Sequence, residues 1–153
     1  MANVEKRIIS SVVLFSLQYP VPRLTTVDRF FGAIVERAAR LICTTPEFDD
    51  LAKAVGLTPL PPSELEENAL YLKERQAGVL KERRAGYGAV RYGIHEPVAR
   101  ARLRAELDGM IAHIYGLTEV EFAHILNSFP LVPEPAKVAA RNAWRDVERG
   151  LIK

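Results

Sequence analysis

The sequence predicts a mainly α-helical protein with five to six short helices around one core and an N-terminal β-strand or hairpin. Apolar residues recur at helical spacing in several segments that glycines and prolines separate. The β-branched run at 8–17 is typical of a strand. With 153 residues, 48% hydrophobic and 26% charged, the chain is long enough to bury a core. We therefore expect a single domain over 1–153.

Three parts are expected within that domain: a strand and proline connector over 1–24, helices with a basic Gly/Tyr loop over 25–96, and a C-terminal helical part over 97–153. The strand is predicted over about 8–19. Lys6 and Arg7 precede it as in a signal peptide, but serines interrupt the run and no small-residue cleavage site follows.

These features predict a cytoplasmic protein. Cys43 is the single cysteine, so an internal disulfide is excluded, and we expect a buried side chain there. No segment approaches the ~18 apolar residues of a membrane span, so no membrane partner is expected. An exposed edge of the predicted strand would need a partner, either an upstream domain or a second copy in a homo-oligomer.

Helices are expected over about 26–42, 46–55 and 63–84 in the N-terminal half. The segment 85–95 is rich in glycine and aromatic residues, which favours a loop or short hairpin. Turn chemistry explains its glycines better than a phosphate-binding motif, whose spacing they do not match. The residues expected to cap or end these helices are Thr45, Gly56 and the Ser63–Glu66 pair.

The C-terminal half predicts helices over 97–116, 118–129 and about 134–149. Thr118 and Glu121 have the spacing of a capping box. We expect the apolar stripes of helices 26–42, 97–116 and 118–129 to form the core.

Positive charge is concentrated between Lys73 and Arg104. This segment holds nine basic and three acidic residues, a local charge of +6 in a chain whose total is +2. Clustered arginines bind phosphates and give salt-dependent affinity for nucleic acid. The alternative is a solvated surface without a ligand. The residues expected to contact DNA are Arg75, Lys81, Arg83, Arg84, Tyr87, Arg91, Tyr92, Arg100 and Arg102.

Catalytic and metal sites are not predicted. Glu121 and His124 have the Glu-x-x-His spacing of a metal-binding helix, and His113 lies on the preceding predicted helix. The further ligands of such a site are missing, so packed histidines are the better interpretation. His95 could touch phosphate or cap a helix. No Ser/His/Asp set has a recognisable local context.

Three short motifs lie in order in the C-terminal half: Leu-Arg-Ala-Glu-Leu-Asp at 103–108, Tyr-Gly-Leu at 115–117 and Ile-Leu-Asn-Ser-Phe-Pro at 125–130. This stretch resembles the C-terminus of large adenine-specific DNA methyltransferases of the type IIG restriction-modification and BREX-like phage-defence kind. Tyr19-Pro-Val-Pro22 and, loosely, the segment 37–56 are similar to segments of the same region.

The resemblance implies a non-catalytic DNA-recognition or DNA-positioning module, with double-stranded DNA and a methyltransferase catalytic subunit or domain as partners. The family's Asn-Pro-Pro-Tyr/Phe motif and its S-adenosylmethionine loop are absent here. No cofactor is therefore expected unless a separate catalytic domain supplies the S-adenosylmethionine site. The alternative is a protein–protein interaction or assembly module that docks through 97–116 and 118–129. A small stand-alone enzyme is a third reading, without a visible catalytic constellation.

Overall fold

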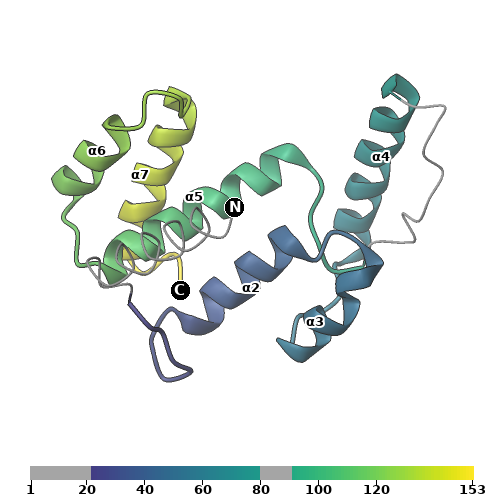
Figure 1. The fold of residues 1–153 in the computed structure, drawn as a ribbon, viewed down its shortest axis with the longest axis horizontal. Coiled ribbons are helices and arrows are strands. Elements are labelled where there is room, and N and C mark those ends of the chain that lie inside the picture. Colours follow the sequence, from purple (N-terminus) through teal and green to yellow (C-terminus); the bar gives the residue numbers. More distant parts are fainter. Residues whose placement is uncertain (1–21, 80–90) are drawn as a thin grey trace, which may run out of the picture.

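The computed structural model describes residues 22–79 and 91–153, and every regular element within them is helical (Figure 1). The elements in chain order are α2 (Phe31–Ile42), a 3₁₀ turn (Pro46–Phe48), α3 (Asp49–Ala54), α4 (Pro62–Val79), α5 (Pro97–Ile114), α6 (Glu119–Asn127) and α7 (Glu134–Glu148).

The expected combination of helices with an N-terminal β-strand or hairpin is therefore corrected. Residues 22–79 and 91–153 contain no strand, so the fold they show is helical without a sheet. The residues on which the strand was predicted, 8–19, lie outside the described ranges, as does most of the Gly/Tyr segment. A β-branched run shows only that a segment suits a pleated surface, and it does not supply the partner strand that a sheet needs.

Helix α5 lies at the centre of the molecule, where it contacts both α2 and α7 (Figure 1). Helices α2 and α7 both pack against α5, and α6 packs on α7. Gly109 marks the contact with α7, because a Cβ there would lie 2.8 Å from the Trp144 backbone nitrogen. Helix α4 stands apart from α6 and α7 at the other end.

Two clusters of buried side chains are found where we expected one core, and other buried residues, such as Met110, belong to neither cluster. The first lies between α2, α3 and the residues before α5, and the second joins α5, α6 and α7. The expected core omitted α7, although Ala140, Ala143 and Val147 of that helix are buried. The first cluster consists of Ala39, Cys43, Ala52, Leu57 and Tyr92 with Phe48 beside it. The second consists of Ala112, Phe122 and Ala140 with Leu117, Leu126 and Trp144 beside it.

Several predicted helix ends are confirmed. Gly56 and Gly116 adopt positive φ angles of 72° and 67° just after α3 and α5, a conformation that glycine adopts without strain. Thr118 accepts a hydrogen bond from the Glu121 amide, and the Glu121 carboxylate accepts one from the Thr118 amide in return. This is the reciprocal capping box that the spacing predicts.

Two predicted starts are wrong. Helix α2 begins at Phe31 rather than near Thr26, because Asp28 accepts hydrogen bonds from the Thr25 amide and hydroxyl and holds a turn there. Val27 consequently lies outside the helix and is 91% exposed. Helix α4 begins at Pro62, so Ser63 lies inside it rather than at its N-cap.

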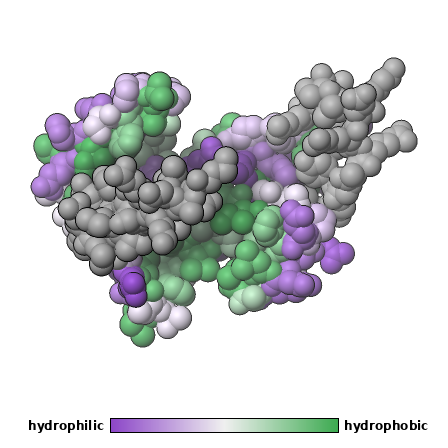
Figure 2. Space-filling model, in the orientation of Figure 1, coloured by the Kyte–Doolittle hydropathy of each residue, from purple (hydrophilic) through white to green (hydrophobic). Residues whose placement is uncertain are grey.

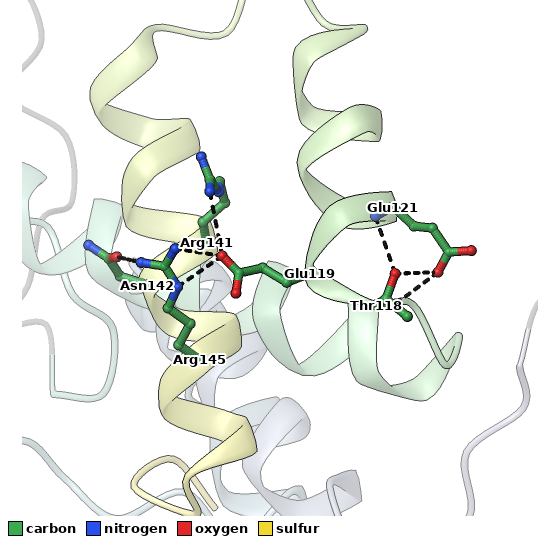
Figure 3. A network of polar contacts seen from close by, with 6 residues as sticks. All are labelled: Thr118, Glu119, Glu121, Arg141, Asn142 and Arg145. Carbon is green, nitrogen blue, oxygen red and sulfur yellow. Dashed lines mark hydrogen bonds and ion pairs between the residues drawn. The ribbon is translucent and has the colours of Figure 1, made fainter.

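An ion-pair network attaches the start of α6 to α7 (Figure 3). One carboxylate oxygen of Glu119 accepts hydrogen bonds from Arg145 Nε at 2.9 Å and Nη2 at 2.5 Å, and from Arg141 Nη2 at 3.4 Å. The hydrogen bonds from Arg145 are the main reason that the pKa of Glu119 lies below its ordinary value. Glu119 is one residue beyond the Thr118 cap, so capping and interhelical pairing act at the same helix end.

Hydrophobic residues gather over α2 near the middle of the face drawn in Figure 2, and hydrophilic residues cover much of the α6–α7 end. Phe31, Ile34 and Val35 of α2 are only half-buried. None of the helices in the described ranges is long and apolar enough to cross a membrane.

Candidate functional site

The segment 91–96 lies between α2, α4 and α5 and is fixed by contacts with all three. Its Ile94 amide donates to the Arg40 carbonyl at 2.9 Å, and Arg40 Nη1 donates to the Tyr92 carbonyl at 3.0 Å. Gly93 is required for the close approach, because a Cβ there would overlap the Cys43 carbonyl and lie 2.8 Å from Thr44 Cα. The sequence alone suggested only a flexible glycine turn here.

Asn68 of α4 holds the same segment from the other side. Its amide nitrogen donates to the Gly93 carbonyl at 2.9 Å, and its amide oxygen accepts from the His95 backbone amide at 2.7 Å. The Asn68 side chain is buried, so these bonds form away from water and would be costly to lose. Asn68 therefore fixes the position from which α5 starts.

Arg100 connects α5 to the C-terminal end of α2. Its Nη1 donates to the Ile94 carbonyl at 2.7 Å and to the Leu41 carbonyl at 3.1 Å. The last carbonyls of a helix lack intrahelical partners, and a cation at that end also complements the helix dipole. Arg100 thus donates to a carbonyl of α2 that lacks a partner within the helix. The same side chain lines a hollow.

That hollow is a basic pocket of about 400 Å³ beside the first turns of α5. Arg100 and Arg104 lie on one face of the helix, because four residues make about one turn. No carboxylate lines the pocket among the residues that the structure describes. The lining consists of Thr44, Thr45, Tyr71, His95, Pro97, Arg100 and Arg104.

The electrostatics of the basic pocket are unbalanced. Burial lowers the pKa of Arg100 from its ordinary value, and the neighbouring charge of Arg104 lowers it further. Arg104 is exposed and forms no ion pair with any described residue. His95 Nε2 lies 2.8 Å from the Thr44 carbonyl, and since a carbonyl only accepts, that nitrogen carries the hydrogen.

A second hollow, the mixed-charge groove, lies beyond the segment 94–96. Ile94 and Glu96 line the groove, whereas His95 between them lines the basic pocket. The groove is lined by Glu36, Arg37, Arg40, Pro61, Glu64, Glu67, Asn68, Ile94, Glu96, Ala99, Arg102, Leu103 and Glu106.

The charges of the mixed-charge groove are largely paired. The Glu106 carboxylate accepts from Arg37 Nε at 2.6 Å and from Arg102 Nε at 2.7 Å. Burial alone would raise the pKa of Glu106, but the hydrogen bonds and charges of both arginines outweigh it and hold that pKa below its ordinary value. Glu106 thereby joins α5 to α2 as an ion.

The predicted DNA-contacting residues do not share one surface. Arg100 lines the basic pocket, Arg102 lines the mixed-charge groove, and Arg91 is exposed. Tyr92 is buried in the first cluster, so it packs rather than facing a groove of DNA. Arg75 lies in the second half of α4. The predictions for Lys81, Arg83, Arg84 and Tyr87 fall outside the described residues.

Sequence reasoning omitted several residues of the basic pocket from its expected DNA contacts. The i, i+4 spacing of Arg100 and Arg104 was a usable signal, since it places both on one helix face. Thr44, Thr45 and Tyr71 could not be found in this way, because they reach the pocket from α2's end and from α4.

The other candidate side chains have structural contacts. Glu121 belongs to the capping box of α6, and His113 stacks on Trp144 with ring centroids 4.7 Å apart. Within the described ranges, no three His, Cys, Asp or Glu residues are grouped to hold a metal ion. Cys43 is buried as expected, and burial followed by the charge of Asp49 raises its thiol pKa.

The described residues therefore do not neutralise the positive charge of the basic pocket. Comparison of the chain with models of protein families, with characterised proteins and with solved structures found no match.

Proposed function

We propose that this chain binds the phosphate backbone of double-stranded DNA through the basic pocket, and that it is a non-catalytic recognition or positioning module. The observation that carries the proposal is that Arg100 and Arg104 line one pocket, and that none of its described lining residues is a carboxylate. Arginine presents a planar fork of donors that matches phosphate oxygens. Such contacts position a protein on DNA without reading its sequence.

The surrounding charge supports the same partner. Both arginines of the pocket, Arg100 and Arg104, lie within the +6 segment that begins at Lys73. Arg91, which is exposed, adds a further cation to the same segment. Tyr92 and Arg102 are left out of the proposed contact surface, because the first is buried and the second is paired with Glu106.

The test is binding of duplex DNA across a salt series. Arg104→Gln removes one proposed phosphate contact and should reduce the slope of log affinity against log salt by about 1. Arg102→Gln removes the same charge from the opposite side of α5 and serves as the matched control, which should retain the wild-type slope. Absence of binding even at low salt would refute the proposal.

The wider assignment is to an adenine-specific DNA methyltransferase of a restriction-modification or phage-defence system. It rests on the motifs at 103–130 and on the need for a partner that contributes the catalytic and S-adenosylmethionine sites. Adding this chain to a catalytic subunit that lacks its own recognition region should stimulate adenine methylation of duplex DNA. Unchanged methylation at saturating chain would count against this assignment.

A second candidate function is protein–protein docking, and exposed apolar side chains around α6 favour it. Val120 is 79% exposed, Leu131 is 95% exposed, and Phe129 between them is also exposed. Leu131→Asp should then abolish association with a methyltransferase subunit in size-exclusion chromatography and leave DNA affinity unchanged. If the association survived this substitution, docking at this surface would be excluded.

A further inference from the structure

The basic pocket and the junction of the fold share one side chain. Arg100 uses Nη1 to hold the Ile94 and Leu41 carbonyls, while the same side chain lines the pocket. His95, two residues before α5, lines the pocket and is held by Asn68 and Thr44. Any ligand that fixes Arg100 therefore also acts on the contacts between α2, α4 and α5.

The pocket also carries repulsion that a ligand would relieve. Like charges at i and i+4 on a helix destabilise it, and the charge of Arg104 opposes that of Arg100. An anion between the two guanidinium groups converts this repulsion into two attractions. Tyr71 also lines this hollow, and a tyrosine hydroxyl can donate to a phosphate oxygen, whereas the Thr44 and Thr45 hydroxyls donate to the Ile42 carbonyl and the Glu47 carboxylate.

We propose that the basic pocket clamps one phosphate group between Arg100 and Arg104, and that the bound phosphate stabilises the junction of α2, α4 and α5. The clamp rests on the proposed function only for the source of the phosphate, which would be a DNA backbone diester. A free phosphate ion offers the same chemistry, so both sources are tested.

The first measurement is the melting temperature of the full chain with rising inorganic phosphate at constant ionic strength. A ligand that binds only the folded state, present at ten times its dissociation constant, should raise the Tm of a protein of this size by about 3 °C. Phosphate also stabilises proteins through exclusion from their surface, and that effect is common to all variants. The result is therefore the difference between variants.

Arg104→Gln is the informative variant, because Arg104 is exposed and its loss leaves the bonds of Arg100 in place. Arg102→Gln is the control of equal charge. We expect wild type and Arg102→Gln to show the additional rise and Arg104→Gln to lack it. An equal rise in all three proteins would overturn the clamp.

The coupling to the fold is tested by amide hydrogen exchange. The Ile94 amide donates to the Arg40 carbonyl inside the junction. Phosphate at ten times its dissociation constant should slow exchange of this amide about tenfold if opening of the junction releases the ligand. Unchanged Ile94 exchange, with phosphate bound, would show that the pocket and the junction are not coupled.

The second experiment measures the binding of duplex DNA to wild type and to the same two variants. Phosphate binding that depends on Arg104, without any DNA binding, would uphold the clamp and refute the proposed function. DNA binding that is insensitive to Arg104, together with no specific phosphate effect, would refute the clamp and leave DNA binding to another surface.

Discussion

The two hollows beside α5 are both lined by arginines and differ in what surrounds those arginines. In the mixed-charge groove, Glu106 pairs with Arg37 and Arg102 in bonds of 2.6 and 2.7 Å. In the basic pocket, Arg100 and Arg104 both line the wall, and none of the described lining residues is a carboxylate. Arg102 lies two positions along the chain from each of these arginines. Two positions correspond to about 200° around the helix, so Arg102 lines the other hollow. Position on the helix therefore decides which of the two hollows an arginine of α5 lines.

The difference also has an energetic meaning. A buried carboxylate paired with arginines contributes to the folded state, and its loss leaves an uncompensated charge. An exposed arginine that forms no ion pair with a described residue contributes little to folding. The comparison makes separate predictions for the two hollows, and substitutions can test each of them.

The largest effect is expected at Glu106. Glu106→Gln removes the charge that holds Arg37, whose side chain is only 17% exposed, and should lower the free energy of unfolding by ~3 kcal/mol. Urea unfolding measures this loss. Glu67→Gln, at an exposed position of the same groove, is the control and should stay within about 0.5 kcal/mol of wild type. Equal effects of the two changes would contradict the distinction.

Asn68 should have the next largest effect, because it fixes the segment that divides the hollows. Asn68→Ala leaves the buried carbonyl of Gly93 and the His95 amide without their partner and should cost ~2 kcal/mol. The same unfolding experiment measures it. Because the wall of the basic pocket moves with this segment, the variant should also lose any phosphate-dependent rise in Tm. A variant with wild-type stability would show that the segment holds its place without Asn68.

The pH dependence of stability distinguishes an ionised Glu106 carboxylate from a protonated one that is only hydrogen-bonded. The folded pKa of Glu106 is lowered, so its stabilising contribution is present above the unfolded value of about 4.3 and disappears as pH falls through the folded pKa. The stability difference between wild type and Glu106→Gln should therefore narrow as the pH falls from 6 to 3. Other carboxylates titrate in both proteins and cancel in this difference. A constant difference would argue against an ionised Glu106.

The smallest effect is expected at Arg102, the outer member of the Glu106 pair. Its side chain is 80% exposed, so solvent screens the ion pair, and Arg102→Gln should cost less than about 1 kcal/mol. Thermal unfolding of this variant alongside Arg37→Gln provides the comparison, with the larger loss expected for Arg37. A larger loss of stability for Arg102→Gln than for Arg37→Gln would show that side-chain exposure does not determine which of the two ion pairs of Glu106 contributes more.

Local signals predicted the helices well where the physical cause was also local. Gly56, Gly116 and the Thr118–Glu121 box act within one turn of their own helix ends, so their spacing is sufficient. The start of α2 was misjudged because the Asp28 side chain competes with helix formation through the Thr25 turn. The predicted strand could not be checked against its neighbouring residues alone, since strand pairing depends on a partner elsewhere in the chain.

The candidate site was harder to predict because its geometry depends on contacts between distant residues. The density of arginines between Lys73 and Arg104 predicted a contact segment that contains two lining residues of the basic pocket, Arg100 and Arg104. It did not separate Arg100 from Arg102, because the deciding partner of Arg102 also holds Arg37 on another helix. Tyr92 was taken for an exposed aromatic of a glycine-rich loop, whereas the approach of Gly93 to Cys43 brings this residue into the core.

The central position of α5 has a consequence for how this protein can change. Glu106 fixes the helix to α2, and three residues later Gly109 meets the backbone of α7. Inserting one residue between them would rotate α7's docking site by about 100° relative to α2. Substitutions on the outer faces of α5 leave this relationship intact, whereas an insertion or deletion breaks it. The spacing between these two positions is therefore expected to tolerate no change in length.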